Sequence, residues 1–386
     1  MLADFGAEVL KIEDTGGGDY LRWAPPYCGD EDKAALGTRS ALYLALNRNK
    51  RSARIDLKSD AGREAFLRLA RSYDVLLESF RPGVLDRLGV GYEKLREENP
   101  GIVYCAISGY GQSGSQSQRA GHDINYLGQN GLLALTGAAG GPPISAATQI
   151  ADIGGGSMMA TIGILTALRE RDRSGEGQVV DVSMTDGSLS WLVYAAARYF
   201  ADGESRRRGA DELSGGLICY LPYEAKDGWV SVGALEPKFW QAFCTGVERE
   251  DLLERQFEAP GSAAHAEMTA IFAARTREEW RRFNDEHDCC IEPISELEEA
   301  LESDLVRERE MVVELDQPEI GKVRQLGVPL KLTRTPAAGP GPAPALGEHT
   351  EAALIEAGYS AQEVEELLAS GAVAGLATEA QDPFLG

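Results

Sequence analysis

Residues 59–78 read SDAGREAFLRLARSYDVLLE, and this stretch decides the fold class. Its apolar residues recur at the spacing of an amphipathic helix over 59–72, with Ser59 or Asp60 placed to cap the first turn. The apolar run over 73–78 then reads as a short buried strand. A helix that leads directly into a buried strand is the repeating unit of an α/β fold.

The same alternation continues on both sides of this stretch. Strands are predicted over 8–12, 102–108 and 178–184, and a further helix over 92–98. Strands that alternate with helices form a parallel sheet, so the sequence predicts a large Rossmann-like α/β domain. Because such sheets bind ligands at the carboxyl ends of their strands, we expect a site near the glycine-rich loop that follows Ser108.

A chain of 386 residues is too long for one compact core and predicts more than one domain. We assign 1–213 to the large domain. The segment 214–309 is predicted to be a smaller α+β domain, in which Asp-Gly at 227–228 marks a hairpin between two strands. The remainder, 310–386, is predicted to be a linker and a C-terminal return to the large domain, because 336–344 (PAAGPGPAP) cannot hold a helix.

Composition excludes several functional classes. The chain has 38 Lys and Arg against 61 Asp and Glu, a net charge of −23, and a field of this sign repels nucleic acid. No unbroken apolar run reaches the roughly 18 to 20 residues that span a bilayer, so we predict no membrane partner and a cytoplasmic location. The six cysteines form no CxxC pair and the four histidines are isolated, which predicts reduced thiols and no metal site.

Two local clusters of basic residues interrupt this acidic chain. The first is NRNKRSARIDLK at 47–58, which could hold phosphate groups by charge-assisted hydrogen bonds, or could equally be a solvated loop and a strand edge. The second is the turn Ser79-Phe80-Arg81 with Pro82 and Gly83, followed by Arg87; its proline and glycine could aim guanidinium groups at an anion.

Three acid–base candidates lie elsewhere. His122, in GHDINY at 121–126, stands beside a carboxylate and titrates near neutrality, although a lone histidine is more often structural. Asp152 precedes three glycines at a predicted helix start, where it could also be a plain N-cap. Glu236 opens a helix before Pro237, with the same two interpretations. The glycines after Ser108 lack the following helix that a dinucleotide fingerprint needs.

Together these stretches resemble the class III CoA-transferase family, which includes carnitine CoA-transferase-like proteins, formyl-CoA transferase and α-methylacyl-CoA racemase. The resemblance covers nearly the whole chain. It is carried by LADFGAEVLKIE, NRNKRSARIDLKSDAGREAF, DVLLESFRPGVLDRLGVGYEKL, IVYCAISGYGQSG, GHDINYLGQNGLL, IADIGGGSMMATIGILTAL, GEGQVVDVSMTDG and ALGEHTEAALIEAGYSAQEV.

The resemblance implies a substrate and an assembly. It implies an interlocked-ring homodimer and an acyl-CoA thioester as substrate, with no cofactor beyond coenzyme A as part of that substrate, and a role in lipid metabolism. The CoA-binding residues that it implies are Arg48, Lys50, Arg51, Ile55, Asp56, Leu57, Lys58, Ser79, Phe80, Arg81, Arg87, Gly121, Asp123, Ile124, Asn125 and Tyr126.

The resemblance also assigns the chemistry. Asp152 matches the carboxylate used throughout the family: a nucleophile in the transferases, which forms an aspartyl-CoA thioester, and a proton carrier in the racemase branch. There a histidine matching His122 handles the proton on the opposite face of C2, backbone amides near 154–156 would stabilise the enolate, and an acid matching Glu236 orients the histidine.

Because GHDINY is similar to the racemase branch, we favour a racemase or epimerase of 2-methylacyl-CoA thioesters, with CoA transfer as the alternative. Two features depart from the family pattern. Relatives usually carry a further strand and helix ahead of LADFGAEV, which predicts an uncovered sheet edge. Asp14 stands where relatives often have an arginine that meets the nucleotide phosphate.

Overall fold

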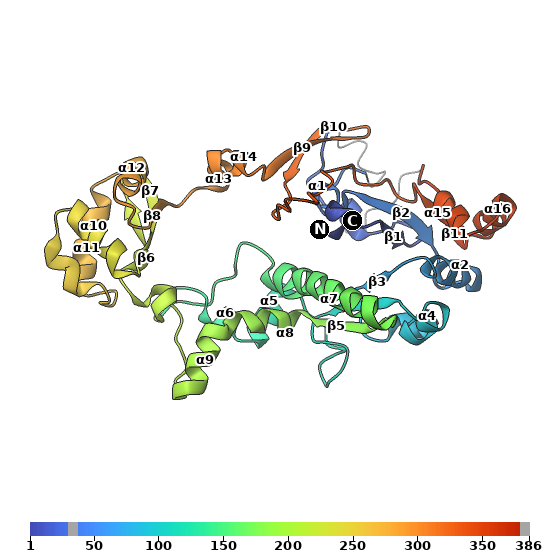
Figure 1. Cartoon of the computed structure of the whole chain (residues 1–386), viewed down its shortest axis with the longest axis horizontal. Coiled ribbons are helices and arrows are strands. Elements are labelled where there is room, and N and C mark those ends of the chain that lie inside the picture. Colours follow the sequence, from blue (N-terminus) through green and yellow to red (C-terminus); the bar gives the residue numbers. More distant parts are fainter. Residues whose placement is uncertain (30–37, 379–386) are drawn as a thin grey trace. The chain divides into compact units, whose positions relative to one another are not determined.

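The computed structural model describes residues 1–29 and 38–378, and these residues divide into two compact units (Figure 1). Unit 1 consists of Met1–Ser108, Ala160–Val182 and Glu299–Gly386. Unit 2 consists of Gly109–Met159 and Ser183–Glu298. The end of the predicted C-terminal return, 379–386, lies outside the described residues.

This division differs from the predicted domain boundaries. The sequence prediction assigned 109–159 and 183–213 to the large domain, whereas the structure groups them with the small one. The physical reason is local packing, because three short helices from these two segments contact one another closely and lead directly into the next hairpin. The C-terminal segment packs with the N-terminal one in unit 1.

Unit 1 contains the helices and strands that alternate between residues 8 and 108. Its strands are β1 (Val9–Glu13), β2 (Lys50–Ile55), β3 (Val75–Glu78), β4 (Val103–Ser108), β5 (Val179–Ser183), β9 (Val312–Gln317), β10 (Gly321–Leu326) and β11 (Val373–Ala374). Its helices are α1 (Ala41–Asn47), α2 (Asp60–Ala70), α3 (Val84–Arg87), α4 (Tyr92–Glu98), α7 (Met159–Ser174), α13 (Leu297–Leu301), α14 (Asp304–Glu308), α15 (Thr350–Glu356) and α16 (Ala361–Ser370), with short 3-10 helices at Leu2–Phe5 and Tyr20–Trp23. The predicted helices and strands between 8 and 108 are confirmed within one or two residues, and Ser59 is the cap of α2.

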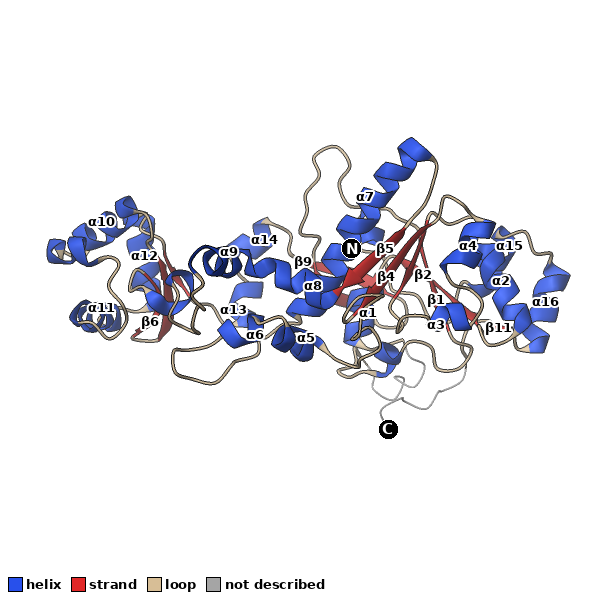
Figure 2. Ribbon diagram, turned by 90° about the horizontal axis from the view of Figure 1, so that it is seen from below, coloured by secondary structure: helices blue, strands red, loops and turns tan. Residues whose placement is uncertain are grey.

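The sheets of unit 1 are only partly parallel. Strand β1 pairs with β2 in parallel and β3 pairs with β4 in parallel, as predicted. The two pairs belong to separate sheets, β1-β2-β11 and β3-β4-β5, and β11 runs antiparallel to β2. The prediction of one wholly parallel sheet is therefore wrong. The antiparallel member, β11, is a two-residue strand from the returning C-terminus, and so short a strand has no periodicity that the sequence could reveal. Helices α2, α15 and α16 lie beside the first sheet (Figure 2).

A buried ion pair fixes the loop after β1. Glu13 accepts hydrogen bonds from Arg22 Nε (2.8 Å) and Nη2 (2.6 Å) and from Ser52 Oγ (2.6 Å). The side chain of Arg22 is fully buried, and Tyr43 lies against its guanidinium. These hydrogen bonds to charged groups compensate the desolvation of both charges and hold β1 against β2.

The return to unit 1 is firmly attached. The segment 336–344 has no helix or strand, as predicted, but the amide and carbonyl of Ala343 both bond to the Gln317 side chain, and Gly341 N bonds to Asn49 Oδ1. Thr350 is the first residue of α15, and its hydroxyl is bonded to Arg54 N and Gly347 O.

Unit 2 combines a small sheet with an aromatic core. Its elements are α5 (Asp123–Gln129), α6 (Leu132–Leu135), the π-helix η4 (Ile150–Met158), α8 (Met184–Leu189), η5 (Ser190–Leu192), α9 (Val193–Asp202), η6 (Glu212–Gly216), β6 (Tyr220–Ala225), β7 (Gly228–Gly233), α10 (Pro237–Gly246), η7 (Glu250–Arg255), α11 (Ala263–Ala273), α12 (Arg277–His287) and β8 (Ile291–Pro293). The predicted β6–β7 hairpin is confirmed, and α12 begins with a capping box formed by Thr276 and Glu279. Trp240, Phe243, Phe272 and Trp280 are at most 1% exposed and form the core.

Within residues 1–29 and 38–378, one helix is long and apolar enough to cross a membrane, by length and composition only. This is the continuous helix Ile150–Ser174, formed by η4 and α7, and 39% of its most apolar stretch is buried within the protein. Glycines, serine and threonines interrupt its apolar residues, and the expectation of no membrane partner stays a prediction. A core helix has the same composition, and the first part of this helix is packed in unit 2.

Candidate active site

Asp152 lies in a π-helix that glycines allow to pack closely. It is the third residue of η4, after Ile150 and Ala151, so the plain N-cap interpretation is wrong. A Cβ on Gly155 would lie 2.5 Å from the carbonyl oxygen of Met184, and one on Gly154 would lie 2.0 Å from the ring of Trp191. The glycines therefore let η4 contact α8 at backbone distance. π-Helical turns are rare and are frequent at functional sites.

The start of η4 is bonded to the GHDINY segment. Oδ1 of Asp123 accepts hydrogen bonds from Ala151 N at 2.6 Å and from Asp152 N at 3.1 Å. Asp123 is the first residue of α5, so its carboxylate joins the starts of two helices that lie almost thirty residues apart in the sequence. The sequence expectation placed Asp123 on the ligand, whereas the structure directs one of its oxygens to the backbone of η4.

His122 precedes α5 and is exposed. Its backbone N donates to Asn125 Oδ1 at 3.0 Å, which makes Asn125 part of the helix start. Because His122 is not sealed in a core, its imidazole remains accessible to a ligand. His122 and Asp152 belong to one electrostatic cluster in unit 2, since the charge of His122 acts on the Asp152 carboxyl.

The Asp152 carboxyl has an altered proton affinity. Burial raises its pKa above the usual range, the neighbouring Asp123 carboxylate raises it further, and His122 opposes this rise. No described residue donates a side-chain hydrogen bond to this carboxyl. A half-buried acid without a hydrogen-bond donor and with a raised pKa is suited to exchange protons or to attack an electrophile.

Tyr126 and the glycines around it form the support of this site. Tyr126 is buried, and its hydroxyl donates to Gly121 O at 2.6 Å. A Cβ on Gly109 or on Gly121 would lie within 2.7 Å of the Tyr126 ring. The expectation that Tyr126 lines the ligand is therefore not supported by its position, because its ring is enclosed by backbone and by Tyr110. Ile124 and Asn125 are exposed and remain candidates.

Glu236 is not joined to this cluster by any described contact. It is the exposed residue before α10, and among the described residues no hydrogen bond or ion pair links it to His122. Its charge acts instead on the thiol of Cys290. The predicted role of Glu236 in orienting His122 therefore stays a prediction.

Most basic residues of 47–58 are engaged within unit 1. Arg48 is 8% exposed and bonds to Asp4 at 2.9 Å, and Arg51 bonds to Glu8 and Glu356 at 2.7 Å each. Arg54 is buried against the carbonyls of Gly375, Thr15 and Gly16, and burial lowers its pKa. Arg48 and Arg51 thus have carboxylate partners inside the protein.

The other members of this stretch differ. Lys50 donates to Asn47 Oδ1 at 3.0 Å, and burial together with the nearby Lys11 lowers its pKa to about 8. Ile55 is 2% exposed as a whole residue and pairs with Val373 of β11, so its position does not support the expected contact with a ligand. Asp56 and Leu57 are half-buried, and Lys58 is exposed.

The turn after β3 presents its cations to solvent. Ser79, Phe80, Arg81 and Arg87 are exposed, and within the described residues neither arginine has a carboxylate within 4 Å. Phe80 N donates to Glu78 Oε2 at 2.6 Å, which fixes the turn. Burial raises the pKa of Glu78. These cations lie directly after the carboxyl end of a strand, where the sequence analysis expected a ligand.

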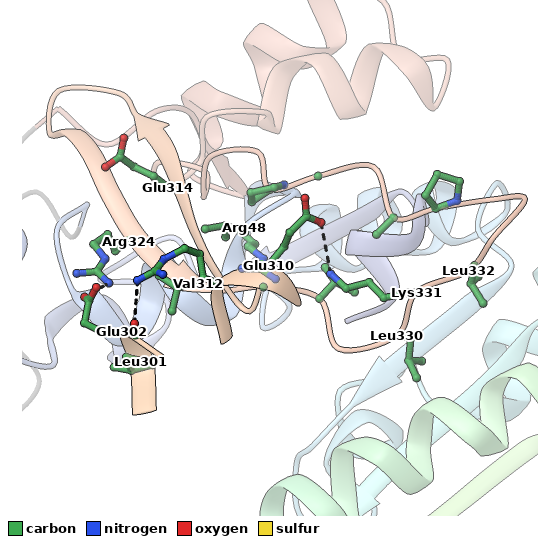
Figure 3. Close-up of a pocket in the computed structure, with 18 residues that line it drawn as sticks. Arg48, Leu301, Glu302, Glu310, Val312, Glu314, Arg324, Leu330, Lys331 and Leu332 are labelled. Carbon is green, nitrogen blue, oxygen red and sulfur yellow. Dashed lines mark hydrogen bonds and ion pairs between the residues drawn. The ribbon is translucent and has the colours of Figure 1, made fainter. Parts of the chain in front are cut away.

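A cavity of about 620 Å³ in unit 1 lies apart from these groups (Figure 3). Of the predicted site residues, only Arg48 is among the described residues that line it. Its other charges form pairs, including Lys331 with Glu310 at 3.8 Å and Arg324 with Glu302 at 2.7 Å. Since these charges neutralise one another, the cavity is not an anion site. No group of three or more possible metal ligands occurs in residues 1–29 and 38–378.

Sequence reasoning missed the residues that position η4. Gly187 approaches the carbonyl of Gly155 so closely that a Cβ would lie 2.1 Å from its oxygen. Asn130 Nδ2 donates to Ser188 Oγ at 2.7 Å and links α5 to α8. The glycine in the TDGS segment at 185–188 was the available signal, because a glycine inside a helix indicates close approach of another backbone.

These features define a class of protein: an α/β protein with a half-buried carboxyl of raised pKa in a glycine-rich π-helix, and an exposed histidine whose charge acts on that carboxyl. The sequence profile of CoA-transferase family III matches residues 1–350, and the chain belongs to that family.

Three relatives illustrate its range. The chain is 37% identical to the α-methylacyl-CoA racemase of Mus musculus, over 95% of this chain and 90% of the relative. It is 33% identical to the succinyl-CoA:mesaconate CoA-transferase of Haloarcula marismortui, over 93% and 91%. The fold is also similar to the crystal structure of a CAIB/BAIF family protein from Brucella suis. Their alignment covers 92% of this chain and 93% of the Brucella chain, with a TM-score of 0.79 and 29% sequence identity.

Proposed function

We propose that this protein is a racemase or epimerase of 2-methylacyl-CoA thioesters, with His122 and Asp152 as the two proton-transferring groups. The observation that carries the proposal is the cluster in unit 2. There the charge of an accessible imidazole acts on a half-buried carboxyl that receives no hydrogen bond from any described side chain. The similarity to the mouse racemase supports the same reaction.

The reaction needs two groups of different proton affinity. One group removes the proton from C2, which is acidified by the adjacent thioester carbonyl, and the other returns a proton to the opposite face of the resulting enolate. The raised pKa of Asp152 keeps a share of this carboxyl protonated at higher pH than an ordinary aspartate. Asp152 can therefore donate a proton in one direction and accept one in the other.

The amides near 154–156, which the resemblance implies as donors to the enolate, stay a prediction. The three amides that precede them are engaged, because those of Ala151 and Asp152 bond to Asp123 and that of Ile153 bonds to Gln149 O. The proposal therefore does not assign enolate stabilisation to these amides.

The second candidate is CoA transfer through Asp152. It is favoured by similar identity to a transferase, 33% over 93% of the chain, and by a carboxyl that no side-chain donor occupies. The carboxylate would attack the thioester carbonyl and release CoA thiolate, leaving a mixed anhydride. The thiolate would then attack the aspartyl carbonyl and expel the acyl group as a carboxylate, giving an aspartyl-CoA thioester.

The two reactions can be separated in deuterated water. We expect the wild type to incorporate deuterium at C2 of a chiral 2-methylacyl-CoA with no acceptor acid present, and H122Q and D152N to lose this exchange. The transferase becomes the better assignment if three results are found together. These are no exchange at C2, acyl transfer that requires an acceptor acid, and a hydroxylamine-sensitive adduct at Asp152.

For the CoA part, the proposal assigns the phosphates to the exposed cations Lys58, Arg81 and Arg87 rather than to the internally paired Arg48 and Arg51. Charge-assisted hydrogen bonds to phosphate need donors that no carboxylate neutralises. A homodimer belongs to the same proposal, and sedimentation equilibrium of the full chain tests it, since a monomer at all concentrations would contradict it.

A further inference from the structure

One carboxylate oxygen holds the start of the π-helix that carries Asp152. Asp123 Oδ1 accepts from two consecutive backbone amides, those of Ala151 (2.6 Å) and Asp152 (3.1 Å). The first amides of a helix have no partner within it and need an external acceptor. The residue before η4, Gln149, supplies no side-chain bond, so this function is performed from a different helix.

We propose that Asp123 is a positioning residue: its carboxylate fixes the first turn of η4, and with it the place of the Asp152 carboxyl, instead of binding the substrate. This inference rests on the proposed function only in taking Asp152 as the reacting group. It assigns to Asp123 a role different from the ligand contact expected from the sequence.

Helices α5, α8 and η4 contact one another, and Asp123 makes the polar contact between α5 and η4. Helix η4 contacts α8 through Gly155 and Gly187, where no side chain fits between the backbones. Helix α5 is joined to α8 by Asn130, which donates to Ser188 Oγ at 2.7 Å and to Thr185 O at 3.1 Å. The contact between α5 and η4 is completed by Asp123. Without it, the amides of Ala151 and Asp152 lose their acceptor, and the turn that carries the reacting carboxyl is free to shift.

The same carboxylate also acts through its charge. Burial is the largest cause of the raised pKa of Asp152, and the Asp123 charge is the second. Position and charge can be separated by substitution, because an asparagine keeps an oxygen that accepts from both amides but carries no charge. Alanine removes both contributions.

The experiment compares D123A and D123N by steady-state kinetics across pH. Misplacement of a reacting group by about 1 Å costs on the order of 100-fold in rate, so we expect kcat of D123A to fall by about 100-fold with little change in KM. D123N restores most of kcat and moves the acid limb of the kcat/KM profile to lower pH, because Asp152 ionises more readily without a neighbouring charge. D285N, on an exposed surface of α12, is the charge control and behaves as wild type.

A ligand-contact role predicts the opposite pattern, with KM raised and kcat retained in D123A, and that result would overturn the inference. Failure of D123N to rescue kcat, or an unchanged acid limb, would also contradict it. Nucleophilic attack needs ionised Asp152, and so does racemisation in the direction in which Asp152 removes the proton. The profiles are therefore measured with each enantiomer, and the acid limb reports on Asp152 for the enantiomer that Asp152 deprotonates.

A structural measurement keeps the inference independent of the reaction. Hydrogen–deuterium exchange of a peptide covering 149–158 should accelerate in D123A and stay near wild type in D123N, because the two amides keep their acceptor only in the second. Unchanged exchange in D123A refutes the positioning role whatever the chemistry. A wild type that neither exchanges C2 nor transfers CoA refutes the proposed function alone.

Discussion

Strand β2 and the turn after β3 carry similar basic sequences but surround them differently. On β2 and just before it, Arg48 and Arg51 bond to carboxylates of the same unit, and Arg54 bonds to backbone carbonyls. Arg81, in the turn after β3, and Arg87, at the end of α3, are exposed and have no carboxylate within 4 Å in the described part of the chain. Arg48, Arg51 and Arg54 are therefore engaged within the protein, whereas Arg81 and Arg87 are open to an anion.

The difference shows that a basic motif does not reveal which of its cations have carboxylate partners in the folded protein. The partners of Arg48 and Arg51 lie at Asp4, Glu8 and Glu356, between 43 and 305 positions away in the sequence. A cation in a strand of an acidic protein is close to carboxylates once the chain folds. A cation in a turn at the end of a strand projects beyond them. Placement relative to the sheet edge therefore decides which cluster can bind phosphate.

The largest effect should follow from Arg48. Replacing it by Met leaves the nearly buried Asp4 without its guanidinium, and breaking such a pair costs about 3–5 kcal/mol of unfolding free energy. Urea unfolding measures the loss. CoA affinity, measured by calorimetry below the unfolding transition, should not change.

The double variant D4N/R48M is the control. Because it removes both charges, it should recover part of the lost stability, with Asn49 still donating to residue 4. A single R48M that keeps its stability and loses CoA binding would show that the first cluster also serves the ligand, and would remove the contrast between the two regions.

Arg81 should give the next largest effect, on binding rather than on stability. A hydrogen bond to a charged group contributes about 1.5–3 kcal/mol, so R81A should weaken coenzyme A by about 10- to 150-fold. The free energy of unfolding should change little, since the side chain is exposed. Calorimetric titration with coenzyme A, and with dephospho-CoA to identify the phosphate, measures the loss.

The matched variant is R96A, which removes an exposed arginine paired with Glu93 on α4 and changes the net charge by the same amount. Its CoA affinity should equal that of the wild type. Equal weakening in R81A and R96A would mean that the long-range field of the protein, and not a contact at the turn, is responsible.

Local patterns predicted the elements of this fold but not its long-range contacts. The helix over 92–98 and the cap at Ser59 follow from spacing and propensity within a few residues, and the structure has both. Strand β11 is two residues long and exists only because the returning chain reaches β2. Pairings of this kind depend on distant segments and leave no local periodicity.

The site follows the same division. His122, Asp123 and Asp152 were recognisable as residues with reactive side chains beside glycines, and the structure groups them in unit 2. Which of them faces the ligand was not recognisable, because the bond from Asp152 N to Asp123 links segments 29 positions apart. Burial of Tyr126 by Gly109 and Gly121 is a packing result of the same kind.

Lys50 offers a pH test of the β2 environment. Its pKa falls to about 8, chiefly through burial and then through Lys11, whereas an unfolded lysine titrates near 10.4. Between these values the unfolded chain binds a proton that the folded chain does not, so stability rises with pH. Allowing for partial exposure, we expect the wild type to gain about 1 kcal/mol relative to K50M between pH 7 and 10. The free energy of unfolding of K58M, changed at an exposed position, should follow the same pH dependence as that of the wild type. The same pH dependence in K50M would mean that β2 does not desolvate the amine of Lys50.

The smallest effect, and the sharpest test of the contrast, belongs to Arg51. Its partners Glu8 and Glu356 have side chains 64% and 58% exposed, so water screens both ion pairs. We expect R51M to lose only about 0.2–1 kcal/mol of unfolding free energy, less at high salt, and to bind coenzyme A as the wild type does. Stability as a function of salt and calorimetric titration measure the two properties. A stability loss this small would mean that Arg51 can leave its two carboxylates and bind a phosphate with little loss of folding free energy. Unchanged CoA affinity in R51M would therefore show that the turn after β3, and not strand β2, binds the phosphates, whereas a loss equal to that of R81A would place both regions on the ligand.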